Sequence, residues 1–362
     1  MTRLFPYILL LTLSLPIKGL AQETRQPQDI QTEQNNPIPI GLLLPDSSLP
    51  HVIEAAELAI HQANVSGGYM NREFSLVIRT AEGFWGAGSK ESVRLVYDDH
   101  VCAIVGSLDG RNGHLAEQVA TKSHLTYMET YATEPTLSQA FVPWFMRVVP
   151  NDDQQSITIL NQIRENGGGK TGILSLETYD TRYAVRSMIK ALAGGNGVAP
   201  LVIDLDSNNI QQNQVVDRIV KSGIEHLVIP FDAVYLGDLI AALRVADPSL
   251  YIYGNLHFTM GAEGRGAGWA KYEDLYLITP FQGIVKHASV TDSRSAYMYD
   301  AVTMVINAIQ HAGTDRQAIT DYLSRSEFKG GSTGPISFDE MGNRSGDPVL
   351  SHIEKGVPQL LK

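Results

Sequence analysis

The sequence predicts an α/β protein with two Rossmann-like lobes, each a parallel β-sheet flanked by helices. From residue 38 onward, short runs rich in Val, Ile and Leu alternate with segments in which apolar residues recur every three or four positions. Such alternation is typical of parallel sheets whose strands are connected by helices. It occurs in two series separated near residue 150, and 362 residues are enough for two domains with separate cores.

The first series opens with a continuous apolar run at residues 38–44, which predicts a buried strand. Ile53, Ala56 and Ile60 then have helical spacing. Gly67 is expected to end that helix. The alternation continues with strands at 74–79, 101–106, 125–128 and 144–149 and helices at 89–97 and 114–122.

The second series predicts helices at 154–165, 183–193, 212–222 and 235–245 and strands at 172–176, 201–205, 226–230 and 251–253. The C-terminal part does not continue the alternation, because helices predicted at 296–312 and 316–324 follow one another. Further strands are predicted at 275–279, 333–339 and 349–354. The glycine-rich residues 261–268 lack the register of a dinucleotide-binding turn, so we expect a loop there.

The N-terminal residues have the features of an export signal. Arg3 precedes an apolar run at residues 4–15, and Ala21 ends a stretch of small residues where cleavage is expected. The alternative, a membrane-spanning helix, needs about 20 apolar residues, more than this run contains. Residues 22–37 are rich in Gln, Asn and Pro, and we expect a flexible leader. The sequence thus predicts a signal peptide at 1–21, export, and no stable insertion in the membrane.

Charge and cysteine content exclude several classes of protein. With 28 Lys and Arg against 39 Asp and Glu, the net charge of −11 argues against a dedicated nucleic-acid or anionic-membrane binder. Cys102 is the single cysteine, which excludes a disulfide within the chain and a Cys-based zinc cluster. It also excludes the lipid-attachment motif of a lipoprotein near the N-terminus.

No motif of the sequence carries a catalytic set. The run GGGKT at 167–171 has Arg164 where a P-loop needs its first glycine, and it follows a predicted helix. The SxxK match at 187–190 falls inside an amphipathic helix, and neither HExxH nor GxSxG occurs. We therefore expect no enzyme activity, no cofactor and no metal.

Polar loops follow the predicted strands of the first series, where open α/β sheets bind their ligands. The loops at 46–48, 109–112 and 130–133 each precede a helix or turn. Backbone N–H groups at a helix start, together with hydroxyl groups, suit a carboxylate or another polar head group. The alternative is that Asp109 and Thr133 only cap helices or turns.

Several short motifs occur in the order found in a known family: Gly67-Gly68, then residues 101–106, ATEPTL at 132–137, FMRVVP at 145–150 with DDQQ at 152–155, AYMYDA at 296–301 and GPISFD at 334–339. Together they resemble the type I periplasmic binding proteins, specifically the branched-chain amino acid and amide (Leu/Ile/Val-binding-like) group that serves ABC importers. The resemblance spans about residues 38–355.

The resemblance implies two lobes joined by three crossings, with a ligand held between them by hinge closure. Carried over, lobe 1 is 38–148 plus 276–326, and lobe 2 is 149–275 plus 327–362. It also implies a periplasmic location, ABC permease subunits as partners, and a monomer.

In family members that bind amino acids, a Ser after the third strand and a Thr after the fourth hold the ligand's α-carboxylate and ammonium groups. Thr133 matches the Thr, whereas the Ser position falls on Gly110, where only the backbone can bind. In lobe 2 the acidic partner of the ammonium falls near Leu256 or His257, and an aromatic position falls near Asp232.

Tyr179 matches an aromatic residue that covers the ligand in the family. A buried ammonium without an anionic partner is costly, so unless Asp109, Asp180 or Asp232 substitutes, the ligand is not a zwitterion. Tyr131, Trp85 and Phe281 could extend an apolar wall, with core packing as the alternative for the last two. The predicted ligand-binding residues are Asp109, Gly110, Tyr131, Thr133, Tyr179, Asp232 and His257.

The sequence therefore predicts a periplasmic solute-binding component of an ABC importer that captures a small organic ligand, such as an amino acid or amide. The alternative is a periplasmic sensor or accessory protein that uses the same fold for another ligand and a non-ABC partner.

Overall fold

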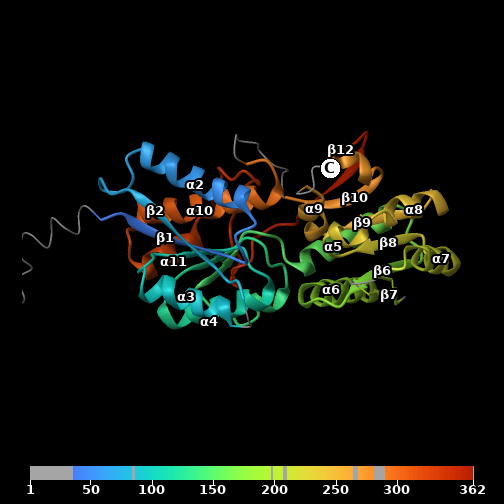
Figure 1. The fold of residues 1–362 in the computed structure, drawn as a ribbon, viewed down its shortest axis with the longest axis horizontal. Helices are drawn as coiled ribbons and strands as arrows, with labels where there is room; N and C mark the ends of the chain where they lie inside the picture. The colour runs from blue at the N-terminus through green and yellow to red at the C-terminus, as the bar shows by residue number, and fades with distance from the viewer. Residues whose placement is uncertain are drawn as a thin grey trace, which may run out of the picture. The chain divides into compact units, whose positions relative to one another are not determined.

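A computed structural model describes residues 36–83, 86–196, 199–206, 210–263, 268–280 and 290–361. The predicted signal peptide, nearly all of the predicted leader, Trp85 and Phe281 lie outside these ranges. In Figure 1 the described chain forms two parallel-dominated sheets flanked by helices, as the sequence predicts. No helix among the described residues is both long enough and apolar enough to span a membrane.

The first sheet has five parallel strands in the order β2-β1-β3-β4-β5. Six of the seven residues of β1 are buried, because the strand pairs on both edges and helices cover both faces. This burial explains the uninterrupted apolar run in the sequence. The strands are β1 (Ile38–Leu44), β2 (Phe74–Thr80), β3 (Ile104–Gly106), β4 (Tyr127–Glu129) and β5 (Phe145–Arg147).

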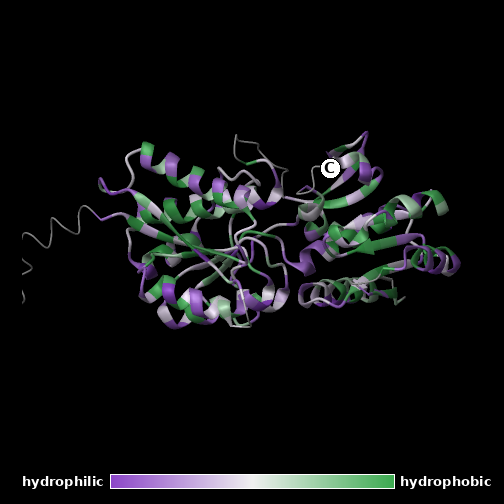
Figure 2. Ribbon diagram, viewed as in Figure 1, coloured by the Kyte–Doolittle hydropathy of each residue, from purple (hydrophilic) through white to green (hydrophobic). Residues whose placement is uncertain are grey.

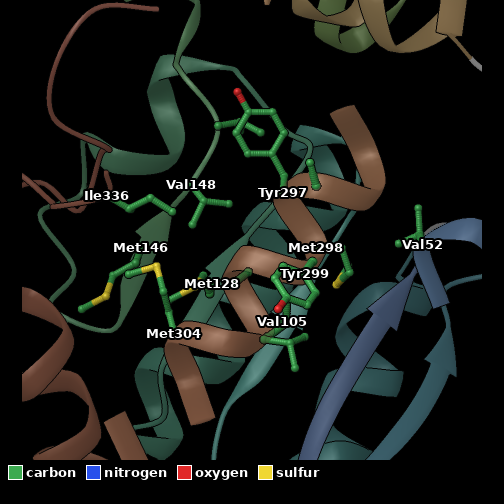
Figure 3. Close-up of a cluster of buried hydrophobic side chains, with 14 of the residues drawn as sticks. Val52, Val105, Met128, Met146, Val148, Tyr297, Met298, Tyr299, Met304 and Ile336 are labelled. Atoms are coloured by element: carbon green, nitrogen blue, oxygen red, sulfur yellow. The ribbon is translucent and has the colours of Figure 1, made fainter. Parts of the chain in front are cut away.

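One face of the first sheet is covered by a helix from the C-terminal part of the chain. In Figure 3, Met304 of α10 (Ser293–Ala312) lies beside Met128 of β4 and Met146 of β5. Helix α2 (Pro50–Val65), which follows β1 in the sequence, packs beside α10. Residues distant in the sequence therefore complete one core. The other helices of this lobe are α2 (Pro50–Val65), α3 (Ala87–Tyr97), α4 (Gly110–Ser123) and α11 (Arg316–Arg325).

The second sheet has seven strands in the order β12-β11-β10-β9-β8-β6-β7. Strands β6 to β10 are parallel, and β11 and β12 add an antiparallel hairpin. Lys355 and Gly356 both have positive φ in its two-residue turn, as a tight hairpin requires. The strands are β6 (Thr171–Leu176), β7 (Leu201–Leu205), β8 (His226–Ile229), β9 (Tyr251–Gly254), β10 (Leu275–Thr279), β11 (Val349–Glu354) and β12 (Val357–Leu360).

The helices around the second sheet enclose a separate apolar core that includes Leu227 and Ile252 of its central strands. Figure 2 shows hydrophobic residues along the strands of both sheets, whereas the helices carry both kinds of residue. The helical elements here are α5 (Asp152–Glu165), α6 (Tyr179–Asn196), α7 (Gln212–Ser222), α8 (Leu239–Ala246), α9 (Leu256–Glu263) and the short 3-10 helices η2 (Ala233–Leu236) and η3 (Trp269–Tyr272); η1 (Pro135–Ser138) precedes β5.

Three of the predicted elements are wrong. The helix expected at 235–245 is divided into η2 and α8, because Gly237 between them has a φ of +52°. The strand expected at 333–339 forms only isolated bridges, at Ile336 and Phe338. The loop expected at 261–268 begins inside α9, while residues 264–267 lie outside the described ranges.

The predicted lobe boundaries differ from the structure at two places. Strand β10 pairs with β9 and β11, so residues 276–279, which were predicted in lobe 1, belong to the second sheet. The amides of Ser332 and Thr333 donate to Asp300 of α10, which attaches residues beyond 327 to the first lobe. The chain rejoins the second sheet at β11. We use lobe 1 and lobe 2 below for the parts built on the first and second sheet.

Candidate ligand-binding cleft

Polar loops follow β3 and β4 in lobe 1 and β6, β8 and β9 in lobe 2, and hydrogen bonds and ring contacts join the two sets. Parallel strands end at one edge of each sheet, so their loops gather at that edge. A pocket of about 370 Å³ lies between the loops after β2 and β3 and the start of α6. We call this the interlobe pocket; it is lined by Ala81, Gly83, Asp109, Arg111, Asn112, Tyr179 and Asp180.

The start of α4 is closed to a side chain at Gly110. A Cβ on Gly110 would lie 2.5 Å from Cδ of Glu134. The Gly110 N–H donates to Oδ1 of Asp180, which comes from α6 of lobe 2, at 2.9 Å. Asp109 caps α4, because its Oδ1 accepts from the Asn112 N–H at 2.9 Å, and it also lines the interlobe pocket.

The loop after β4 is shaped by a buried carboxylate, that of Glu129. Its Oε1 accepts from the N–H groups of three successive residues, Thr130, Tyr131 and Ala132, at 2.9, 2.7 and 3.1 Å. Burial nevertheless raises the pKa of Glu129 to about 7. This arrangement fixes the backbone that carries Tyr131 and Thr133.

Thr133 lies at the crossing from lobe 1 to lobe 2. Its Oγ1 donates to Oδ1 of Asp152 at 2.7 Å, and the Asp152 N–H donates to the Thr133 carbonyl at 2.8 Å. Burial raises the pKa of Asp152 to about 7, and its Oδ2 is buried without a hydrogen-bond partner among the described residues. The threonine hydroxyl is therefore engaged within the protein.

Tyr131 is held between side chains of both lobes. The His257 ring, from α9, stacks on it with centroids 4.7 Å apart and planes 9° apart. The guanidinium of Arg294, from α10, lies 4.9 Å from the ring centroid. Burial lowers the pKa of His257 to about 4, so the ring is neutral at pH 7 and its Nε2 donates to the Tyr131 carbonyl at 3.2 Å.

Arg294 and Glu263 make two further connections between α10 and lobe 2. Arg294 forms an ion pair with Asp232 at 3.6 Å. Glu263, at the end of α9, accepts from the Ser293 N–H at 2.8 Å and from its Oγ at 3.1 Å. Asp232 also caps η2 by accepting from the Val234 N–H at 2.8 Å.

Tyr179 stands at the start of α6 beside the interlobe pocket. The guanidinium of Arg111, from α4 of lobe 1, lies 5.2 Å from its ring centroid, and that of Arg182 lies 5.7 Å away. The Tyr179 ring therefore lies beside the pocket with two guanidinium groups near its face, an attractive cation–π arrangement.

Acidic side chains gather around Gly110. Burial, with a smaller contribution from the charges of Asp109 and Glu134, raises the pKa of Asp180 to about 7. Glu134 Oε1 pairs with Nε2 of His114 at 2.6 Å, and the pKa of His114 is raised to about 9 by Glu117 and Glu134. Among the described residues, no group of three His, Cys, Asp or Glu side chains is arranged to hold a metal ion.

Two buried arginines hold the crossings between the lobes. Arg147, at the end of β5, donates to the carbonyls of Glu134 and Ala132 at 2.6 and 3.4 Å and to Asn343. Arg344 donates to the Val148 carbonyl at 3.2 Å and to Oγ1 of Thr333 at 2.7 Å. The loop that carries Thr133 is therefore tied to the C-terminal crossing.

The structure places the predicted site residues as follows. Gly110, Tyr131, Asp232 and His257 take part in contacts between the lobes, Asp109 and Tyr179 line the interlobe pocket, and Thr133 lies at the crossing. The sequence-based set omitted Glu134, Glu263 and Arg294, and it named Asp180 only as a possible ammonium partner. Glu134 lies inside the ATEPTL motif, but that motif does not reveal its partner His114. Asp180, Glu263 and Arg294 lie in no such motif, and each depends on a partner at least 30 positions away.

Two α/β lobes whose strand-end loops face each other define a two-lobed solute-binding protein. A family model described as "Periplasmic binding protein" matches residues 37–349, and the chain belongs to this family.

Solved structures of substrate-binding proteins share this fold. The branched-chain amino acid protein LivJ from Streptococcus pneumoniae, in complex with isoleucine, is 19% identical with a TM-score of 0.73, covering 90% of this chain and 99% of that chain. The leucine-binding protein LivK from Thermotoga maritima is 16% identical with a TM-score of 0.75, covering 90% and 98%. A solute-binding protein from R. palustris in complex with benzoate is 14% identical with a TM-score of 0.76, covering 90% and 95%.

Proposed function

We propose that this protein is the substrate-binding component of an ABC importer and captures a small organic ligand between its lobes. The observation that carries the proposal is that the loops at the strand ends of both sheets meet through Tyr131 and His257, beside a pocket lined by residues of both lobes. The relatives with this fold are named as substrate-binding proteins of ABC transporters.

In the proposed mechanism lobe 1 receives the ligand's head group and lobe 2 completes the site when the lobes close. Gly110, Tyr131 and Thr133 stand on the first side, and Tyr179, Asp232 and His257 on the second. A closed pair of lobes, stabilised by ligand, is then the form that permease subunits recognise. We further propose that residues 1–21 direct export and that the mature monomer works in the periplasm.

A thermal-shift screen of the mature chain, from residue 22, tests the function. The panel contains amino acids, amides, amines and aromatic acids, since ligands of the similar structures include leucine, isoleucine and benzoate. A ligand at 100 times its dissociation constant stabilises the folded state by about 2.7 kcal/mol, which raises the melting temperature by roughly 5 °C. We expect such a shift with at least one compound, and no shift across the panel contradicts the proposal.

The variant His257→Ala links the shift to the cleft. His257 touches Tyr131 across the lobes, so the variant should lose most of the ligand-induced shift while it still folds. A matched control is His311→Ala, because His311 stacks on Tyr322 away from the strand-end loops and should leave the shift unchanged. An unchanged shift in His257→Ala contradicts the assignment of the cleft as the binding site.

A further inference from the structure

The start of α4 already holds two carboxylates, those of Asp109 and Asp180, and both belong to the protein. Asp180 reaches from lobe 2 and accepts the Gly110 N–H at 2.9 Å. In the amino-acid-binding proteins that the sequence resembles, the residue at this position helps to hold the carboxylate of the ligand. The N–H groups at a helix start attract anions. Here Asp109 accepts the Asn112 N–H and Asp180 accepts the Gly110 N–H, so carboxylates of the protein occupy these donors.

The hydroxyl groups that such a site needs are also missing or engaged. Gly110 has no side chain, and the space where one would begin is filled by Glu134. Thr133 Oγ1 donates its proton to Asp152. A carboxylate that entered here would have to displace Asp180 and would find no free donor from either residue.

Buried oxygen atoms without hydrogen-bond partners near Gly110 favour a ligand that donates hydrogen bonds. Oε2 of Glu134 is buried without a partner among the described residues, and it would lie 2.8 Å from a Cβ on Gly110. Oδ2 of Asp152 is likewise buried and unpartnered within the described part of the chain. The terminal N–H groups of Arg147 donate to carbonyls, Ser138 and Asn343, while its Nε is buried without a partner among the described residues. Buried acceptors without donors are costly, and an N–H group would satisfy them.

We infer that Asp180 is the specificity-determining residue of the cleft: its carboxylate stands in for that of a ligand, so the ligand is an amine or amide without a carboxylate. This inference rests on the proposed function and narrows it. Leucine, isoleucine and benzoate, which occur in the similar structures, would then be poor ligands.

Matched probe pairs test the inference by isothermal titration of the mature protein. Each acid is compared with relatives that lack the carboxylate: leucine with leucinamide and isoamylamine, and benzoate with benzamide and benzylamine. Comparing the amides with the amines shows which of the two groups donates the N–H in the cleft. We expect the unmodified protein to bind an amide or amine at least about tenfold more tightly than the matching acid.

The variant Asp180→Ala should reverse the preference. With the Gly110 N–H released, binding of leucine or benzoate should improve at least about tenfold over the unmodified protein. Asp180→Asn, which removes the charge and keeps the shape, is the second variant and should give a smaller gain. Asp217→Ala is the control, because Asp217 is an exposed carboxylate that pairs with Lys221 on α7.

The outcomes distinguish the inference from the proposed function. If the unmodified protein binds leucine or benzoate as tightly as Asp180→Ala does, the inference fails and the binding function stands. If Asp180→Ala and Asp180→Asn both gain nothing for the acids, the inference also fails. If no compound of the wider panel binds the unmodified protein, the proposed function itself fails.

Discussion

At the residue scale, the buried carboxyl group of Asp152, at the crossing between the lobes, makes the stability of the folded protein depend on pH. Burial raises its pKa to about 7, from a usual value near 3.8. The folded state therefore binds the proton more tightly than the unfolded chain does. The stability that this proton contributes is present below about pH 4 and is lost as the pH rises through about 7.

The variant Asp152→Asn should remove this loss, since the amide is uncharged at every pH. We expect the variant to be more stable than the unmodified protein by about 1–3 kcal/mol at pH 8, with a smaller advantage at pH 5 and none below about pH 4. Urea unfolding at both pH values measures it. Asp153→Asn is the control, because Asp153 is the neighbouring exposed carboxylate that pairs with Lys190. Equal differences at pH 5 and pH 8 would contradict the role given to Asp152.

Gly110 provides a second residue-scale prediction. Gly110→Ala places a methyl group 2.5 Å from Cδ of Glu134, so the free energy of unfolding should fall by about 1–3 kcal/mol. Gly194→Ala is the matched control, because a Cβ there meets nothing within 4 Å inside α6, and it should stabilise the helix slightly. Chemical denaturation measures both variants. The prediction fails if the double variant Gly110→Ala/Glu134→Ala does not recover part of the loss.

At the scale of elements, the end of β5 holds the first crossing through Arg147. The strand has only three residues, yet its last side chain is fully buried and donates to the loop between Ala132 and Glu134. Buried carbonyls that lose a charged donor are left unsatisfied, which makes this side chain important for both stability and the position of Thr133.

Arg147→Met should therefore lower the free energy of unfolding by about 2–5 kcal/mol and weaken ligand binding. Urea unfolding and titration with the ligand found in the thermal-shift screen check the two effects. Arg164→Met, at the exposed end of α5, is the control and should change neither. A stable Arg147→Met variant with unchanged affinity would show that the crossing does not depend on this residue.

Most helices and strands could be predicted from the sequence, and the exceptions have physical causes. Helix α9 was missed because Leu256 to Ala262 are all buried, so the segment has no polar face and no helical period in its pattern. Residues 333–339 have a strand-like composition, but Thr333 and Ser332 bind Asp300 of α10 instead of a neighbouring strand.

The candidate site could be predicted only in part. The loops after the strands were predictable, since the ends of parallel strands gather at one edge of a sheet. The pairing across the lobes was not, because Tyr131 contacts a residue 126 positions away and Gly110 one that is 70 positions away. Asp180 was named from the sequence as a possible partner of a ligand's ammonium group, and in the structure it accepts the Gly110 N–H from lobe 1.

At the scale of the whole molecule, we propose that the two lobes close on a ligand. Among the described residues, the contacts that join them include Gly110 with Asp180, Tyr131 with His257, and Arg294 with Asp232. Arg294 also contacts Tyr131 within lobe 1, and Asp232 also caps η2 within lobe 2.

Closure of the lobes can be tested by small-angle X-ray scattering of the mature protein, with and without the compound that gives the largest thermal shift. We predict that the radius of gyration falls when that compound binds, and that Tyr131→Ala, which removes the ring between Arg294 and His257, abolishes the fall. A compound that binds tightly while the radius of gyration stays constant would contradict capture by closure of the lobes.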